Sequence, residues 1–277
     1  MLTKRLRIIE ITETIQESPN TKTFLFDWEV EAKPGQFVMV WLPGVDELPM
    51  ALSSLGNPKA ITVQGLGDAT KQMLSLKEGD RLGIRGPYGK PFWLEGERLL
   101  LAGGGTGMAS LIALVETPPF REAHREIVIG ARNKEALLFV DRCRKAGCLV
   151  HVATDDGSEG FQGFVPALAE KVLDAGTFDS VYSCGPEIMM KGVFDSARKR
   201  GLKVQVSMER RMRCAFGICD ACEFGGSLVC ADGPVFSGEE IAANPDFCQF
   251  RRDKTGRRLP LFSKGPRGQQ GRGLPNR

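Results

Sequence analysis

The sequence predicts a β + α/β protein: an N-terminal antiparallel barrel, then a parallel-sheet α/β domain, then a small C-terminal cysteine lobe. Short segments of the first hundred residues alternate apolar and polar positions or are rich in β-formers. From Gly96 onward, strand-like runs alternate with helical patterns. From Met212 onward the regular pattern stops and cysteines crowd together. We therefore expect domains at residues 1–96, 97–207 and 208–250, and a basic, flexible tail at 251–277.

The barrel is expected to consist of short strands separated by turns that contain Gly, Pro or Asn. One short helix is expected between the last two strands, at residues 68–80. Several closely spaced strands with a single helix are typical of a small antiparallel barrel. The expected strands lie at residues 5–14, 21–28, 36–42, 59–66 and 80–87.

The second domain is expected to contain five parallel strands connected by helices. The first strand, at residues 98–105, ends in three glycines, which suit a tight turn into a helix. The other strands are expected at residues 126–132, 148–156, 179–186 and 201–209. The helices are expected at residues 106–116, 133–147, 164–176 and 187–201.

Composition and charge exclude several classes of protein. Hydrophobic residues make up 42% and charged residues 26% of the 277 residues, as in ordinary globular domains. The N-terminal apolar stretch contains acidic residues and is no signal peptide. The longest uncharged run, Leu99–Val115, contains four glycines and is shorter than the roughly 20 apolar residues that span a membrane. We expect a cytoplasmic protein that does not bind membranes, in a compartment where thiols stay reduced.

The expected tail carries most of the positive charge. Residues 251–277 hold nine Lys/Arg and one acid, whereas the net charge of the whole chain is only +3. No aromatic residue is interleaved with these charges after Phe262, which argues against nucleic-acid binding. We interpret the segment as a solvated terminus.

The cysteine spacing is the most specific signal in the chain. Cys214, Cys219, Cys222 and Cys230 are spaced Cys-x4-Cys-x2-Cys-x7-Cys, and the first three match plant-type [2Fe–2S] ligands. A structural zinc site is the alternative, although only one CxxC knuckle is present. Three further cysteines are interpreted as buried or incidental thiols: Cys143, Cys148 and Cys248. The eighth, Cys184, belongs to a motif described next.

A glycine-rich loop lies where a dinucleotide-binding turn requires it, between a strand and a helix. Glycines allow the backbone to approach a pyrophosphate, and the helix N-terminus supplies N–H donors. The alternative is a tight turn that only packs helix on strand. Cys184 and Gly185 end another strand at the same expected edge and favour the binding interpretation. The loop residues are Gly103, Gly104, Gly105, Thr106 and Gly107.

These motifs resemble the ferredoxin–NADP reductase superfamily, in which the barrel holds a flavin and the second domain a nicotinamide. GGTGMA at 104–109, CGPEIMM at 184–190 and RGPYG at 85–89 carry the resemblance. Residues 208–236, with DDGSEGFQGFV at 155–165, are similar to the electron-transfer subunits of NAD-linked (type B) dihydroorotate dehydrogenases. The resemblance covers about residues 5–260.

The resemblance implies an FAD site on the barrel. Gly67, Ala69 and Thr70 lie in the segment that resembles the FAD pyrophosphate loop. The Arg-x-x-Ser flavin motif of the superfamily is replaced by Leu48-Pro49-Met50-Ala51, which lacks both the arginine and the serine. The expected contacts on this segment come from Pro49, Met50, Ala51, Leu52 and Ser53. Arg132 follows the second strand of the α/β domain and leaves the choice between NAD and NADP open.

The resemblance also implies a function. A nicotinamide moves two electrons as hydride and a [2Fe–2S] cluster carries one, so a flavin must connect them. The three modules use nearly every residue, leaving no segment for an organic substrate. We expect a subunit that passes electrons from the FMN of a dihydroorotate dehydrogenase catalytic subunit through [2Fe–2S] and FAD to NAD+, in pyrimidine (UMP) biosynthesis, as a heterotetramer with two subunits of each kind.

Two alternatives belong to other classes. A reductase subunit of a cytoplasmic hydrogenase or of an NADH-dependent ferredoxin oxidoreductase would share nearly all of these motifs. A non-redox binding protein stabilised by zinc would share only the cysteines, and it would lack visible absorbance.

Overall fold

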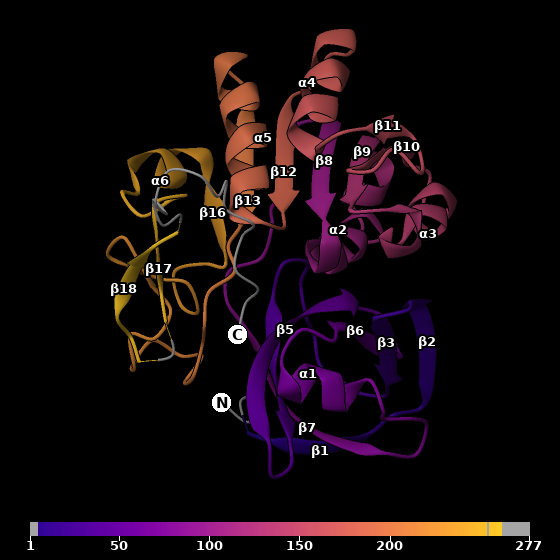
Figure 1. Ribbon diagram of the computed structural model, residues 1–277, viewed down its shortest axis with the longest axis vertical. Coiled ribbons are helices and arrows are strands. Elements are labelled where there is room, and N and C mark those ends of the chain that lie inside the picture. Colours follow the sequence, from indigo (N-terminus) through magenta and orange to yellow (C-terminus); the bar gives the residue numbers. More distant parts are fainter. Residues whose placement is uncertain (1–4, 254, 262–277) are drawn as a thin grey trace.

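The first domain is a strongly curved antiparallel sheet. The computed structural model describes residues 5–253 and 255–261 (Figure 1). The strand order is β1-β7-β4-β5-β6-β3-β2, so the half-barrel stays open between β1 and β2. The predicted short helix is present as α1 (Asp68–Met73), which begins at the expected residue and ends at Met73 instead of residue 80. The strands are β1 (Arg7–Glu10), β2 (Glu13–Ser18), β3 (Thr21–Phe26), β4 (Phe37–Leu42), β5 (Asp46–Ser54), β6 (Lys59–Gln64) and β7 (Arg81–Tyr88).

The interior of this domain is built from apolar residues of the predicted strands. Phe24 and Phe26 of β3, Ile61 of β6 and Ile84 of β7 are fully buried in one cluster. Two features differ from the prediction. The first expected strand is divided into β1 and β2, and β5 was not among the strands expected from alternation. Pro49 and a run of half-buried residues hide the alternation of β5.

The second domain is a mainly parallel sheet in the order β11-β10-β9-β8-β12-β13-β16. Leu100 and Ala102 of β8 contribute to the core on the α4–α5 side, and Leu99 and Leu101 to the core on the α2 side. Both faces are therefore apolar, as parallel sheets covered by helices require. The strands are β8 (Arg98–Gly104), β9 (His124–Ala131), β10 (Leu149–Thr154), β11 (Phe161–Gln162), β12 (Ser180–Cys184), β13 (Lys203–Ser207) and β16 (Val235–Ser237).

The helices agree with the prediction except at residues 133–147. There the chain forms a short 3-10 turn, η4 (Lys134–Ala136), and then α3 (Val140–Lys145). Phe139 separates them with a φ of 62°, which no continuous right-handed helix allows. The other helices are α2 (Met108–Val115), preceded by the 3-10 turn η2 (Gly105–Gly107), α4 (Val165–Ala175) and α5 (Glu187–Lys199), and a further 3-10 turn, η3, lies at Phe120–Glu122. Within the part of the chain that the structure describes, no helix is both long and apolar enough to cross a membrane.

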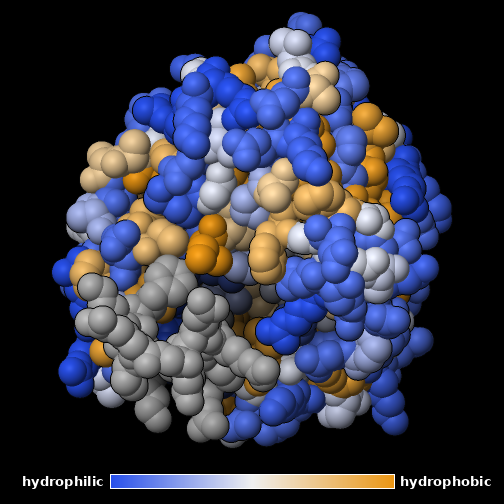
Figure 2. All heavy atoms as spheres, turned by 45° about the horizontal axis from the view of Figure 1, so that its top comes forward, coloured by the Kyte–Doolittle hydropathy of each residue, from blue (hydrophilic) through white to orange (hydrophobic). Residues whose placement is uncertain are grey.

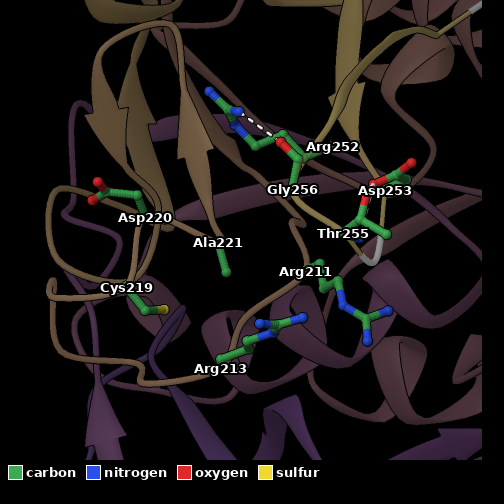
Figure 3. A pocket seen from close by; sticks show the side chains of 9 residues that line it. All are labelled: Arg211, Arg213, Cys219, Asp220, Ala221, Arg252, Asp253, Thr255 and Gly256. Atoms are coloured by element: carbon green, nitrogen blue, oxygen red, sulfur yellow. Dashed lines mark hydrogen bonds between the residues drawn. The ribbon is translucent and has the colours of Figure 1, made fainter.

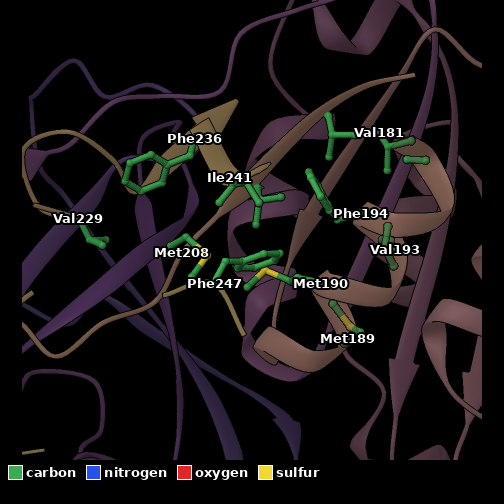
Figure 4. Close-up of a cluster of buried hydrophobic side chains, with 14 of the residues drawn as sticks. Val181, Met189, Met190, Val193, Phe194, Met208, Val229, Phe236, Ile241 and Phe247 are labelled. Carbon is green, nitrogen blue, oxygen red and sulfur yellow. The ribbon is translucent and has the colours of Figure 1, made fainter. Parts of the chain in front are cut away.

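The C-terminal lobe contains more regular structure than its sequence indicates. Its elements are β14 (Glu223–Phe224), β15 (Ser227–Leu228), β16, α6 (Gly238–Ala243), β17 (Phe250–Arg252) and β18 (Arg258–Pro260). Val229, Phe236, Ile241 and Phe247 of the lobe share one core with the α5 side of the sheet (Figure 4). Because β16 pairs antiparallel with β13, the lobe also extends the sheet.

The expected tail begins with ordered structure. β17 pairs antiparallel with β18, so residues 250–260 form a hairpin and not the start of a flexible segment. The remainder of the expected tail, residues 262–277, lies outside the described residues, as does Lys254. The domain boundaries as a whole remain predictions.

Candidate functional site

The four cysteines lie in the lobe, on the loop between β13 and β14 and directly after β15. Cys219 is exposed, Cys214 is half-buried, and Cys222 and Cys230 are buried. The loop bends sharply: Ala215 and Asp220 have φ values of 68° and 52°, which non-glycine residues rarely adopt.

Two of the cysteines are joined by a backbone hydrogen bond. The N–H group of Cys230 donates to Cys222 Sγ at 3.4 Å. Among the described residues, no three Cys, His, Asp or Glu side chains converge as they would around one ion.

Backbone donors surround the first cysteine. The N–H groups of Ile218 and Phe216 donate to Cys214 Sγ at 3.4 and 3.5 Å. Burial alone would raise the pKa of Cys214, but these hydrogen bonds outweigh it and lower the pKa to about 6. Burial and the neighbouring Cys222 thiol instead raise the pKa of Cys230 to about 12. The loop thus stabilises negative charge on sulfur at Cys214, the property that an iron ligand needs.

A basic hollow of about 200 Å³ opens beside Cys219. Figure 3 shows Arg211 and Arg213 along one side of it, with the Cys219 side chain near them. The turn of the β17–β18 hairpin lines the other side. The lining residues are Arg211, Arg213, Cys219, Asp220, Ala221, Arg252, Asp253, Thr255 and Gly256.

The structure brings the two expected nucleotide motifs together at the carboxyl edge of the parallel sheet. Gly103 of β8 pairs with Cys184 of β12. A Cβ on Gly107 would lie 2.5 Å from the carbonyl carbon and oxygen of Cys184, so this approach requires glycine. Thr106 lies in η2, between Gly105 and Gly107.

Gly105 differs from the other loop glycines. It has a φ of 54°, and a Cβ there would meet no atom within 4 Å. The space beside Gly103 and Gly104 is already filled by methionine side chains. A Cβ on Gly103 would lie 2.3 Å from Met108 Sδ, and one on Gly104 would lie 2.8 Å from Met189 Sδ. The open backbone at Gly105 therefore suits an external ligand. Burial raises the pKa of Cys184 to about 12, so its thiol stays neutral at this edge.

The expected flavin residues lie on β5 and at the start of α1. Ala51 packs against the core on the α2 side of the α/β domain, whereas Leu52 points into the barrel. Ser53 is fully buried and its hydroxyl accepts a hydrogen bond from Thr62 at 2.9 Å. Its side chain therefore belongs to the barrel interior, and Pro49 and Met50 are half-buried on the same strand.

The loop before α1 is fixed by one threonine. Thr70 Oγ1 accepts from the N–H groups of Leu66 and Gly67 at 2.9 and 3.0 Å. Gly67 is the N-cap of α1, and Ala69 in the first turn is buried. Gly67, Ala69 and Thr70 therefore lie within one helical turn of each other. The other expected flavin residues, on β5, belong to a different element of the same domain.

Two arginines that the sequence analysis gave no role connect the modules through β5. Arg85 of β7 pairs with Glu47 of β5 and contacts the cysteine loop, with a 2.7 Å hydrogen bond to the Cys214 carbonyl. Arg142 of α3 donates to the Ser53 carbonyl at 2.6 Å. No local signal marks them, because both contacts join residues far apart in sequence.

Comparisons with known proteins agree with this arrangement. Residues 209–242 match the family model described as the iron–sulfur cluster binding domain of dihydroorotate dehydrogenase B. Two curated relatives are named "Probable dihydroorotate dehydrogenase B (NAD(+)), electron transfer subunit". The one from Methanocaldococcus jannaschii is 45% identical, over 91% of this chain and 97% of its own length. The one from Thermoplasma volcanium is 42% identical, over 92% and 99%.

A solved structure is also similar. A chain from the structure of an NADH-dependent reduced ferredoxin–NADP oxidoreductase, described in a study of flavin-based electron bifurcation, superimposes with a TM-score of 0.76. It is 31% identical, and the match covers 84% of this chain and 89% of that one.

The fold and the site together define an electron-transfer reductase of the ferredoxin–NADP reductase type that carries an additional iron–sulfur lobe. The two curated relatives match it across nearly their whole length. The chain belongs to the family of dihydroorotate dehydrogenase B (NAD+) electron transfer subunits.

Proposed function

We propose that this chain carries electrons from the FMN of a dihydroorotate dehydrogenase catalytic subunit, by way of [2Fe–2S] and FAD, to NAD+. The reaction belongs to pyrimidine (UMP) biosynthesis in the cytoplasm. The observation that carries the proposal is the placement of β5, where the cysteine loop contacts one end through Arg85 and the α/β domain contacts the other through Arg142. A flavin on the barrel would therefore lie between the cysteine lobe and the nicotinamide edge.

The residues of the chain have distinct tasks in this reaction. Cys214, Cys219, Cys222 and Cys230 would hold the cluster, and the N–H groups of the loop would stabilise negative charge on sulfur. FAD, when bound to the barrel, would supply the chemistry that connects a one-electron cluster with a two-electron nicotinamide. The backbone of 103–107 would receive the NAD pyrophosphate at the start of α2, and Cys184 and Gly185 close the same edge.

The cysteine loop also has the properties of a docking surface. Ile218 and Phe216 are 75% and 51% exposed, although they are large and apolar. The hollow lined by Arg211, Arg213 and Arg252 also includes Cys219, the residue that follows Ile218 in the chain. Exposed apolar side chains with a charged rim are typical of protein interfaces. We infer that the catalytic subunit, in a complex with two subunits of each kind, covers this loop. Figure 2, in which the top of Figure 1 is turned forward, shows a surface that is mainly hydrophilic with apolar patches between the polar side chains.

Reconstitution tests the proposal. The isolated chain should reduce dyes with NADH and should not oxidise dihydroorotate, and the FMN-containing catalytic subunit should restore NAD-coupled oxidation. Ile218→Asp should weaken the complex by at least about tenfold, because a buried unpaired charge is costly. Leu149→Asp is the matched control, since Leu149 is 54% exposed on the other domain. Dihydroorotate oxidation by the isolated chain would refute the proposal.

A second candidate rests on the similarity to the NADH-dependent ferredoxin–NADP oxidoreductase. In that case the chain would form its complex with another oxidoreductase subunit, or with a hydrogenase. Binding to such a subunit, together with no binding to the dehydrogenase, would favour it.

A further inference from the structure

Arg85 occupies a junction between three elements. Its guanidinium forms a two-point ion pair with Glu47 of β5, at 2.6 Å from Nε and 2.7 Å from Nη2. Nη1 also donates to the Tyr88 hydroxyl at 3.1 Å. Hydrogen bonding to Glu47 is the largest influence on the pKa of Arg85 and raises it. The guanidinium is thus charged, held in one orientation, and only 14% exposed.

The same guanidinium reaches the cysteine loop. Nη1 donates to the carbonyl of Cys214 at 2.7 Å, and Nη2 donates to the carbonyl of Arg213 at 3.0 Å. Two successive carbonyls are therefore bound by one planar group. The half-barrel holds the backbone of the first cysteine directly, although 129 residues separate Arg85 from Cys214. Lysine could not make the same set of contacts, because it lacks the fixed fork of donors.

The opposite end of β5 carries a matching contact. Arg142 forms a two-point ion pair with Glu116, at 2.6 and 2.7 Å, and donates to the Ser53 carbonyl at 2.6 Å. Its side chain is 30% exposed. It has the same chemistry as Arg85, an arginine–carboxylate pair bound to a backbone carbonyl, but it joins β5 to the α/β domain and not to the cysteine lobe.

We propose that Arg85 is a positioning residue for electron transfer, which fixes Cys214 and the cluster it would hold at one distance from the flavin strand β5. The inference rests on the proposed function. Because Glu47 compensates the charge of Arg85, the main effect of Arg85 on electron transfer is to fix the position of the cysteine loop. Electron transfer between two bound groups depends steeply on their separation, and a shift of about 1 Å at a reacting centre can cost up to a hundredfold in rate.

The test separates geometry from charge with three variants of the full chain loaded with FAD and iron. Arg85→Lys keeps the charge and loses the fork. Arg85→Gln leaves Glu47 uncompensated, and the double variant Glu47→Gln/Arg85→Gln removes both charges. Iron and FAD content are measured first. Stopped-flow absorbance then follows flavin reduction by NADH and the subsequent reduction of the cluster, and a potentiometric titration gives the cluster's reduction potential.

All three variants should slow cluster reduction by at least about tenfold while flavin reduction by NADH stays as in the parent chain. The reduction potential should fall only in Arg85→Gln, because only there does an unpaired carboxylate face the loop. Arg200→Gln is the matched control, because Arg200 also joins a carboxylate, Asp174, to a backbone carbonyl, that of Ser196, but lies at the end of α5 and makes no contact with β5 or the cysteine loop. It should change neither the cluster's rate of reduction nor its potential. A general loss of stability would affect the Arg85 and Arg200 variants alike, whereas a positioning role affects only the Arg85 variants.

Two results would count against different claims. If Arg85→Lys and the double variant bind iron and reduce the cluster at the parent rate, the positioning role is wrong and the proposed function stands. If the parent chain binds no cluster, or NADH does not reduce its flavin, the proposed function itself fails. Should Arg85→Gln not fold, Arg85→Lys alone still decides the question.

Discussion

Replacement of Gly105 by valine should lower the affinity for NADH strongly and the stability of the fold only slightly. The φ of 54° at Gly105 costs an L-residue roughly 1–2 kcal/mol. Because a Cβ would meet nothing within 4 Å, no packing clash adds to this cost. At about 2–4 °C per kcal/mol, the apparent Tm should fall by roughly 2–8 °C.

The effect on binding should be larger. The new side chain would fill the open space at the carboxyl edge of β8, where we expect the backbone to approach the pyrophosphate. Loss of one hydrogen bond to a charged group is worth about 1.5–3 kcal/mol. Since about 1.4 kcal/mol corresponds to a factor of ten, the Kd for NADH should rise at least about tenfold. Calorimetric titration with NADH, alongside the KM in a dye assay, measures this change.

Gly201→Val provides the control. Gly201 has a φ of 68° and a Cβ there would also meet nothing within 4 Å, but it lies in the turn after α5. It should lose similar stability with unchanged NADH affinity, and FAD content should stay constant in both variants. Equal losses of affinity in the two variants, or loss of FAD in Gly105→Val alone, would refute the assignment of the nicotinamide edge.

Three further predictions concern other parts of the molecule. Cys222→Ser should abolish the iron–sulfur absorbance and coupled electron transfer while NADH–dye activity persists; full iron content would refute the ligand assignment. In the native iron-free protein at pH 7.5, Cys219 should react rapidly with a thiol reagent and Cys184 should not, because Cys219 is exposed and burial raises the pKa of Cys184 to about 12; mass spectrometry distinguishes the sites. Hydrogen bonds from the backbone N–H groups of Glu97 and Arg98 lower the pKa of Asp179 in the folded protein. The ionised carboxylate therefore stabilises the fold at any pH above about 3.9, the pKa of Asp in the unfolded chain. This stabilisation is lost as the pH falls through the lower pKa of the folded state. Asp179→Ala should therefore lower the Tm more at pH 6 than at pH 2.5, as thermal unfolding followed by circular dichroism would show.

The fold was largely predictable because its elements have strong local patterns. Runs of β-branched and aromatic residues mark β3 and β6, and glycines mark the end of β8. β5 was missed because its side chains contact the α/β domain on one face and the barrel core on the other, so neither face is polar. The lobe was underestimated because β14 to β18 each span only two or three residues, too few to show any period.

The candidate site was predictable where its residues are close in sequence. The cysteine spacing and the glycine loop are local patterns, and the parallel pairing of β8 with β12 brings Gly103 beside Cys184. Arg85 was noted only as part of the RGPYG motif at residues 85–89. Its contact with Cys214 depends on how two distant segments pack, which no local pattern encodes. The burial of the Ser53 hydroxyl depends likewise on its neighbour Thr62.

The pairing of β16 with β13 has a consequence for solubility. β13 would otherwise be the edge strand of the sheet, with Val204 and Val206 among its residues and a row of unpaired backbone groups. β16 covers Gln205 to Ser207, and it belongs to the lobe that contains the four cysteines. If the chain lacks iron, we expect β16 to pair less stably with β13. The backbone groups of β13 would then be free to pair with a strand of another molecule. We therefore expect a larger supply of iron during synthesis to increase the soluble fraction of the protein, independently of its redox activity.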